Sequence, residues 1–293
     1  MIKHYLKVAF RNLMKYKTQS LVSIIGLAVG FTCFALSALW IRYEMTYDNF
    51  HEGAERIYLV RAHYANEPGT SKFTPYPLMK YLQDKMPEIE AVTAFTAHHV
   101  KFRMEDTEQE IGMIAADSVF MNFFDIQLLK GTVNFLKCDG QKVAITKEFA
   151  KRLFSKEEDA LGKEVEVGRR VCKIGAIVSG WSNHSNIPYN ILAPARHSPR
   201  WGSSNEQLFI RVRERTDIDA FRTKMSTVCI NDIEKESELS DLLITRMSAL
   251  RYSDYVDKAD VVISFSYIFY FSLAGGLVII CSLFNYLTLF ISR

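Results

Sequence analysis

The sequence is poor in the residues that mark repetitive, disordered or disulfide-rich chains. Its 293 residues include only 14 glycines and 7 prolines, which excludes a collagen-like chain and a low-complexity tract. Hydrophobic residues make up 48% of the chain, too many for a disordered protein. The 5 cysteines follow no ligand or disulfide spacing, so at least one free thiol is expected and no redox role is assigned.

Acidic residues are absent from both ends of the chain. All 33 Asp and Glu residues lie between positions 42 and 260, whereas residues 1–20 carry five Lys and Arg. A nucleic-acid-binding protein would carry its basic patch on the folded domain instead. The charge distribution therefore argues against a nucleic-acid partner.

Two long segments lack charge altogether. Residues 21–41 and 261–292 contain no Asp, Glu, Lys or Arg. About 20 apolar residues cross the hydrocarbon core of a bilayer as a helix, so each run predicts a transmembrane helix. The first run is longer than the core of a signal peptide and ends in the bulky Leu39-Trp40-Ile41, which argues against cleavage.

The basic residues predict the orientation of these two spans. Lys and Arg favour the cytoplasmic side, so both chain ends are expected there, with residues 42–260 outside. A loop of that length between two spans must be a folded domain. We expect a multi-pass protein of the inner membrane.

The basic segment over residues 1–20 has its own pattern. Apolar residues recur there at helical spacing, with Lys and Arg between them. This pattern predicts an amphipathic helix on the inner membrane surface, its cations facing anionic membrane lipids. The alternative is a plain topology signal in a frayed tail.

The loop of residues 42–260 contains the pattern strand, helix, strand twice. Its strands alternate apolar and polar residues, and its helices repeat apolar residues every three or four positions. The first set covers residues 56–64, 77–86 and 90–104, and the second covers residues 207–213, 217–228 and 242–247. Thr216 and Asp219 form a capping box at the start of the second helix. Two such units predict an open-faced split βαβ sandwich.

These patterns define a predicted α+β fold. Two transmembrane helices flank an extracytoplasmic α/β domain, in which residues 47–107 and 201–258 form the split βαβ subdomain. Residues 108–200 form a second, mixed α/β subdomain inserted into it. A hairpin is expected inside the insertion, turning at residues 168–170.

No catalytic, cofactor-binding or metal-binding set of residues is predicted. Gly162-Lys163 lacks the upstream glycine and the following Ser or Thr of a phosphate-binding loop. His98 and His99 adjoin in a predicted strand, so their side chains point to opposite faces. His51 stands outside any metal-ligand spacing and reads as a surface or satisfied histidine. The acidic run over residues 105–110 reads as a solvated face.

Three residues in the charge-free runs are expected to pack helices. Gly26 and Gly30 form a small-xxx-small motif that lets another helix approach closely. Asn285 is polar at membrane depth and should face protein rather than lipid. The alternative for the glycines is that small residues are simply frequent in membrane spans.

Short motifs in a fixed order resemble the permease subunits of ABC transporters of the MacB/FtsX type. Each motif is weak alone, and their order along nearly the whole chain makes the match specific. They are Tyr5-Leu6-Lys7, Arg11-Asn12-Leu13, Ile25–Gly30, Tyr47–His51, Glu55–Tyr58, Ala116-Asp117, Phe123-Phe124, Leu128–Gly131, Val143–Thr146, Ala150–Phe154, Leu161–Lys163 and Asn285–Leu287. The resemblance implies a porter-like subdomain split around an inserted one.

The resemblance also implies a function and partners. The chain would be the N-terminal part of a permease, truncated at Arg293, that transmits motion from a separate cytoplasmic ATPase to its extracytoplasmic domain for export or extraction of a substrate. The chain itself would be no enzyme and bind no cofactor, since the ATPase binds ATP and Mg²⁺. Further implied partners are a second permease copy or half, an outer-membrane or periplasmic adaptor, and membrane lipids.

Three other functions remain open at this stage. The first is an FtsX-like regulator of extracytoplasmic cell-wall hydrolases that transports nothing. The second is a membrane-anchored sensor, which requires a signalling domain after residue 293. The third is a membrane-anchored enzyme, for which the sequence supplies no catalytic residues.

Overall fold

The structure is a computed structural model of the whole chain. It describes residues 11, 14–15, 17–65, 68–105, 107–137, 141–181, 184–228, 239–252 and 265–291. The chain divides into two compact units, one of residues 1–46 with 263–293 and the other of residues 47–262. The interfacial helix predicted over residues 1–20 lies largely outside the described residues and stays a prediction.

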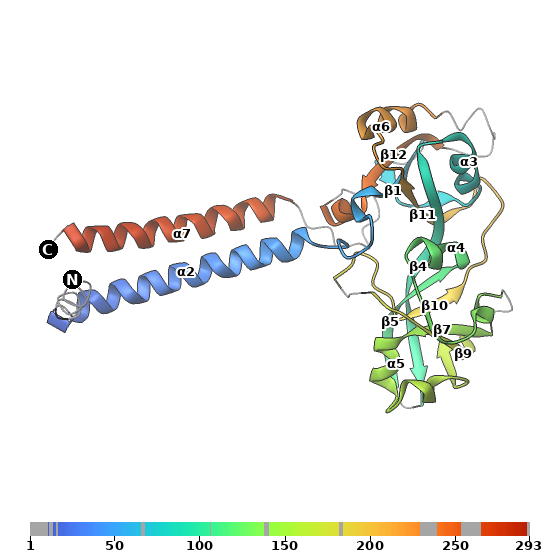
Figure 1. Cartoon of the computed structure of the whole chain (residues 1–293), viewed down its shortest axis with the longest axis horizontal. Helices are drawn as coiled ribbons and strands as arrows, with labels where there is room; N and C mark the ends of the chain where they lie inside the picture. Colours follow the sequence, from blue (N-terminus) through green and yellow to red (C-terminus); the bar gives the residue numbers. More distant parts are fainter. Residues whose placement is uncertain are drawn as a thin grey trace. The chain divides into compact units, whose positions relative to one another are not determined.

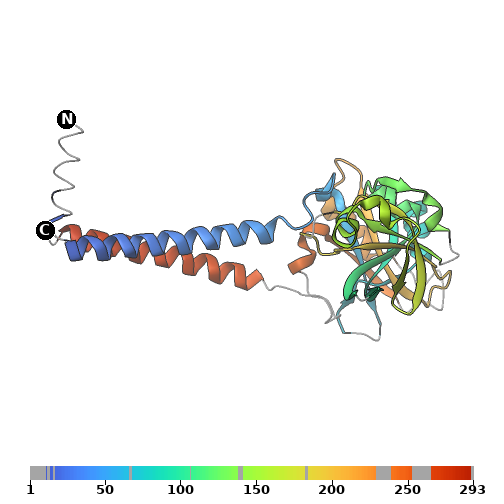
Figure 2. The ribbon, with the colours of Figure 1, turned by 90° about the horizontal axis from the view of Figure 1, so that it is seen from below.

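The first unit consists of two long helices, α2 (Lys17–Met45) and α7 (Phe265–Ile291). They lie side by side and antiparallel, as Figures 1 and 2 show. The rings of Trp40 and Phe271 are 5.0 Å apart. Within α2, the stretch Ser20–Met45 is long and apolar enough to cross a membrane.

One half of the second unit, here called the sheet lobe, is a four-stranded antiparallel sheet with the order β12-β1-β11-β4. Its strands are β1 (Ile57–Tyr64), β4 (Ile89–Met104), β11 (Ser204–Val212) and β12 (Leu239–Arg246). Helix α3 (Pro77–Lys85) joins β1 to β4, and α6 (Ile218–Ser226) joins β11 to β12. The two predicted strand–helix–strand units are therefore both present.

The helices of the sheet lobe cover one face of its sheet. Leu82 of α3, Phe221 of α6 and Tyr58 of β1 are at most 2% exposed and share one hydrophobic core. The prediction for the start of α6 was wrong in detail. Its N-cap is Asp217, which accepts from the N–H groups of Asp219 and Ala220, and Thr216 donates instead to the Arg213 carbonyl.

The other half, here called the barrel lobe, is a closed barrel of six strands. Beyond Phe95, β4 leaves its pairing with β11 and pairs with β5 as a long hairpin. The pairing then runs β5-β10-β7-β9, and β8 closes the ring because it pairs with both β9 and β4. The added strands are β5 (Thr107–Ala116), β7 (Lys142–Thr146), β8 (Glu164–Val167), β9 (Arg170–Val178) and β10 (Ile191–Pro194).

Strand β4 runs through both lobes, so the chain passes from one to the other inside a strand (Figure 1). The sequence analysis separated the two subdomains at residue 107, whereas the pairing partner of β4 changes between Phe95 and Thr96. The predicted hairpin is present, with a two-residue turn at Gly168-Arg169 between β8 and β9.

Short elements complete the second unit. The helices are α4 (Ser118–Phe123) and α5 (Lys147–Leu153), and the remaining strands are β2 (Thr70–Ser71), β3 (Thr74–Pro75) and β6 (Leu128–Gly131). Short 3-10 turns occupy Ala54–Arg56, Val133–Leu136, Glu157–Ala160 and Met247–Tyr252.

A shared core holds the two lobes together. Phe95 of β4 and Phe209 of β11 stack at 5.4 Å, and the Phe95 ring meets Phe120 of α4 edge-on at 4.9 Å. All three side chains are completely buried. Aromatic packing of this kind stabilises beyond the area it buries, so the second unit is one body with two lobes.

Candidate functional site

The segment Tyr47–His51, here called the anchor segment, follows α2 after a single residue and is fixed into the second unit. Asp48 has a left-handed backbone conformation, with φ of 57°, and is completely buried. Its N–H donates to the His184 carbonyl at 3.3 Å. Its Oδ2 accepts from the backbone N–H of Asn186 at 3.1 Å and from the Asn186 side-chain amide at 2.6 Å.

Burial and hydrogen bonds act on Asp48 in opposite directions. Removal from water raises the pKa of its carboxyl group, and the hydrogen bonds from Ser185 and Asn186 partly oppose that rise. A buried carboxylate is tolerated only when donors satisfy it. Asp48 therefore fastens the anchor segment to the loop at residues 184–186.

Tyr47 adds two ring contacts to this attachment. Its ring lies 3.9 Å from the ring of His184, and the guanidinium of Arg251 lies 4.0 Å from its centroid. Tyr47 is 7% exposed. A cation over a tyrosine face is stabilising, so the anchor segment is bound at its first residue to two distant parts of the chain.

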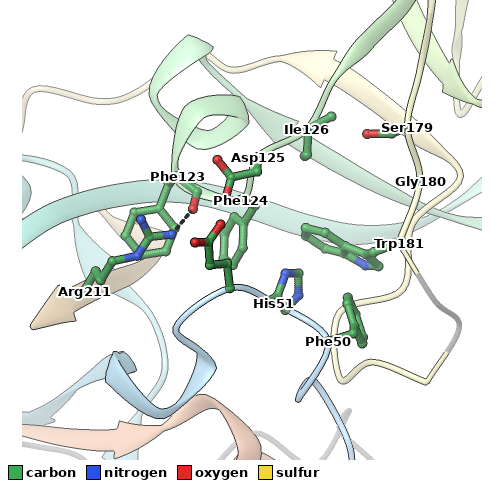
Figure 3. Close-up of a pocket in the computed structure, with 11 residues that line it drawn as sticks. Phe50, His51, Phe123, Phe124, Asp125, Ile126, Ser179, Gly180, Trp181 and Arg211 are labelled. Atoms are coloured by element: carbon green, nitrogen blue, oxygen red, sulfur yellow. Dashed lines mark hydrogen bonds between the residues drawn. The ribbon is translucent and has the colours of Figure 1, made fainter.

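The end of the anchor segment lines a cavity of about 430 Å³. Phe50 and His51 form one wall, and the opposing walls are Phe123–Ile126 and Ser179–Trp181. Figure 3 shows the His51 ring between Phe124 and Trp181. The His51 centroid lies 5.1 Å from Phe124 and 4.9 Å from Trp181.

The surroundings of His51 disfavour its charged form. Burial lowers the pKa of His51 to about 4, and the nearby charge of Arg211 acts in the same direction. At neutral pH the imidazole is therefore uncharged. It packs as an aromatic ring, but its Nε2 is buried without a hydrogen-bond partner among the described residues, so His51 is neither the surface histidine nor the satisfied histidine that the sequence suggested.

Arg211 connects the sheet lobe to the barrel lobe at this cavity. It projects from β11, and its Nη2 donates to the Phe123 carbonyl at 2.6 Å at the end of α4. Its guanidinium also lies 5.0 Å from the Phe123 ring centroid. The cavity is thus the point where the anchor segment, the sheet lobe and the barrel lobe meet (Figure 3).

Some polar groups at the cavity wall make structural hydrogen bonds, whereas His51 Nε2 and Arg211 Nε are buried without a hydrogen-bond partner among the described residues. Ser179 Oγ accepts from the Gln127 N–H at 2.9 Å, and Trp181 Nε1 donates to the Ile187 carbonyl at 2.9 Å. Among the described residues, no group of three or more His, Cys, Asp or Glu could hold a metal ion. The printed contacts of this wall hold the anchor segment against both lobes.

The predicted helix-packing residues fall in the first unit. Gly30 is buried and Gly26 is partly exposed, while the side chain of Asn285 lies outside the described residues. Gly30 lies two helical turns before Ser37, and so on the same face of α2. A Cβ added to Gly275 of α7 would lie 3.3 Å from the Ser37 Cβ. The packing role of Gly26, Gly30 and Asn285 stays a prediction.

Other predicted features are separate from the cavity. The acidic run lies at the β4–β5 hairpin, where Glu108 contacts Arg103 at 2.8 Å and Lys101 at 3.4 Å. His98 lines an opening of the barrel, apart from the anchor segment. The role of Asp48 was not predicted, although Tyr47–His51 was one of the short motifs that carried the family resemblance.

The fold of the second unit and the anchor segment together define a class of protein, in which a mixed α/β domain directly follows an apolar helix in the chain. The chain belongs to the family of MacB-like periplasmic core domains, whose family model matches residues 20–228. This confirms the resemblance to MacB/FtsX-type permeases. The comparison with curated proteins gave no match.

Solved structures with a similar fold are also domains of this kind. A domain of a permease protein from Porphyromonas gingivalis is 20% identical, with a TM-score of 0.54 over 67% of this chain and 92% of that one. The extracellular domain of the noncanonic ABC-type transporter YknZ from Gram-positive bacteria is 14% identical (TM-score 0.49; 64% and 99% covered). The periplasmic region of MacB from Actinobacillus actinomycetemcomitans is 12% identical (TM-score 0.47; 68% and 92% covered).

The family sets the general location and class of the chain. Its members are components of ABC transporter-type permeases, in which the ATPase activity lies in a separate subunit. With α2 as an apolar helix next to it, the mixed α/β domain is the extracytoplasmic part of an inner-membrane protein.

Proposed function

We propose that the extracytoplasmic domain moves as one body with α2 and so carries ATP-driven motion across the membrane. The observation that carries this proposal is the attachment of Asp48. Only Tyr47 and Thr46 separate it from the last residue of α2, Met45, and its hydrogen bonds to Asn186 reach the barrel lobe. Asp48 is therefore a buried attachment of the domain only three residues after the end of α2.

The shared core of the two lobes supports movement of the domain as a single body. Phe95, Phe120 and Phe209 are completely buried and lie on elements of both lobes. Strand β4 also passes through both. A force applied at the anchor segment would therefore reach the far end of the barrel lobe without a hinge between the lobes.

The arrangement of the membrane helices completes the proposal. Helix α7 would be the second span, paired with α2 through Ser37 and Gly275, with Gly26 and Gly30 on the same face of α2. A separate cytoplasmic ATPase would bind ATP and Mg²⁺, and this chain would bind neither. A second permease copy or half, an extracytoplasmic adaptor and membrane lipids would complete the assembly.

A linker insertion tests whether motion passes through the anchor segment. The complete permease is purified with its ATPase in nanodiscs, and Arg200→Cys carries a dye whose energy transfer to labelled lipid headgroups reports the position of the domain. We expect ATP to change the transfer in the wild type. Insertion of Gly-Ser-Gly-Ser after Thr46 should abolish the change while ATP hydrolysis continues.

The matched control is the same insertion after Gly168, in the exposed turn between β8 and β9. This insertion should leave the ATP-driven change intact, because the turn lies far from the anchor segment in the fold (Figure 1). An unaltered change after the Thr46 insertion would contradict transmission through the anchor segment. A tightly co-purifying cell-wall hydrolase in place of a transported substrate would support the FtsX-like regulator instead.

A further inference from the structure

The interior of the barrel lobe is only partly filled by its own side chains. Strand residues point alternately into and out of a barrel, and the inward set forms one hydrophobic core. Phe102 and Phe149 fill one part of it, with ring centroids 5.1 Å apart. Elsewhere the inward side chains are small, notably Ala115, Val143 and Ala193.

A cavity of about 400 Å³ opens where these small side chains lie. Its floor is apolar and includes Met113, Val143, Val167, Cys172 and Ala193. The volume lies within the range of about 300–1,000 Å³ that is typical of small-molecule sites, and barrel mouths are a common place for them. The opening and its floor are here called the barrel mouth.

The rim of the barrel mouth is strongly cationic. Arg169, Arg170 and Arg196 line it together with His98, and among the described residues that line it there is no Asp or Glu. The rim thus gathers positive charge beside an apolar floor.

Arg170 lies at the edge of the barrel mouth. Arg170 follows the tight turn at Gly168, which has φ of +63° and fixes the end of β8 against the start of β9. Burial raises the pKa of the Cys172 thiol on the cavity floor, and the charge of Arg170 opposes that rise. Arg170 also lies directly opposite Val167, a residue of the barrel core, in the β8–β9 pairing, so both side chains leave the sheet on the same, inward face.

We propose that the barrel mouth binds an amphiphile with one anionic head group and a medium-length acyl chain. The chain would occupy the apolar floor, and the guanidinium groups would bind the oxygens of a carboxylate or phosphate head, for which their forked geometry is suited. An amphiphile with a cationic head would be rejected by the three arginines. This inference does not depend on the proposed transmission of motion.

Photo-crosslinking tests the proposal on the full chain in nanodiscs of zwitterionic phosphatidylcholine. The probe is decanoate with a diazirine at its chain end, and labelled peptides are identified by mass spectrometry. We expect labels on peptides that contain Met113, Val143 or Ala193. Excess decanoate and decyl phosphate should both compete, whereas decyltrimethylammonium, with the same chain and the opposite charge, should not.

Two variants separate head recognition from chain binding. The double variant with Arg169→Gln and Arg170→Gln changes two exposed residues at the β8–β9 turn. Competition by decanoate should become about tenfold weaker or more, since hydrogen bonds to a charged head group are lost. Ala193→Leu fills the floor and should reduce labelling with the rim intact. Arg200→Gln, an exposed arginine outside the cavity, is the control and should bind like the wild type.

Several results would overturn the proposal. These are equal competition by the cationic amphiphile, unchanged labelling in the double arginine variant, or labels confined to α2 and α7. If the proposal holds, nanodiscs containing anionic phosphatidylglycerol identify the source of the ligand. If this lipid competes with the probe, the natural ligand is a bilayer lipid. If decanoate competes but this lipid does not, the natural ligand is a free amphiphile.

Discussion

Asp48 Oδ2 accepts two hydrogen bonds from Asn186, one from the backbone N–H at 3.1 Å and one from the side-chain amide at 2.6 Å. The two residues are 138 positions apart in the chain. Asp48 lies at the start of the second unit, so this contact joins the beginning of the domain to the barrel lobe. It also marks where the domain can be cut from the rest of the chain.

The first prediction is that residues 47–262 fold as a soluble domain without the membrane helices. This range contains every described strand and the hydrophobic cores of both lobes. We expect one cooperative transition in urea, followed by tryptophan fluorescence. A shorter fragment that starts at Phe50 lacks Asp48 and should unfold at lower urea. An aggregated or non-cooperative 47–262 fragment would be evidence against this.

The second prediction concerns the Asp48–Asn186 contact itself. Asp48→Ala in the excised domain should lower the free energy of unfolding by about 1–3 kcal/mol, because it leaves the partly buried Asn186 donors without their acceptor. Asp84→Ala, at an exposed position of α3, is the matched control and should change it by less than about 0.5 kcal/mol. Equal effects of the two substitutions would mean that the contact does not hold the anchor segment.

The third prediction is a pH dependence that His51 causes. Its pKa is about 4 in the folded domain, against an ordinary value of 6.5. Between these values the unfolded chain binds a proton that the folded domain does not, so stability falls as the pH drops from 6.5 to 4. The loss should be at most about 3 kcal/mol.

Comparison with a variant isolates the contribution of His51, since the raised pKa of Asp48 acts with the opposite sign. His51→Phe keeps an aromatic ring against Phe124 and Trp181 but cannot be protonated. We expect the wild type to lose stability relative to the variant as the pH falls. The free energy of unfolding of both proteins is measured by urea unfolding from pH 7 to 4. A constant difference would show that His51 does not titrate between these limits.

The strand–helix–strand units were predictable because their signals are local. Residues 57–64 form β1, and Pro77 begins α3, as the sequence indicated. No strand was predicted over the acidic run of residues 105–110, which was interpreted as a solvated face. In the structure β5 begins at Thr107, and Glu108 lies opposite Arg103 across the hairpin, where opposite charges stabilise the pairing.

The barrel closure and the anchor were not predictable from local patterns. Strand β8 has only four residues, and its pairing with β4 depends on strands far away in the sequence. The partner of Asp48, Asn186, likewise comes from a loop with no distinctive pattern. Both features depend on contacts between residues far apart in the sequence, and local patterns in a single sequence do not reveal such contacts.

The fourth prediction concerns the pairing of α2 and α7. In a background without native cysteines, Ser37→Cys with Gly275→Cys should form a disulfide under mild oxidation. A Cβ on Gly275 would lie 3.3 Å from the Ser37 Cβ, close to the separation of about 3.5–4.5 Å in disulfides. Ser37→Cys with Gly276→Cys is the control, since a Cβ on Gly276 meets no atom within 4 Å. Cross-linking of both pairs, or of neither, would contradict the observed helix contact.

The measurement that tests the central claim most directly is the side of the membrane on which the domain lies. In a cysteine-free background, Ser118→Cys is at an exposed position of the second unit and Lys17→Cys at an exposed position near the start of α2. A membrane-impermeant maleimide applied to cells with a permeabilised outer envelope and an intact inner membrane should label Ser118→Cys and spare Lys17→Cys. Labelling of Lys17→Cys with protection of Ser118→Cys would place the domain in the cytoplasm and contradict its role as the extracytoplasmic part of a permease.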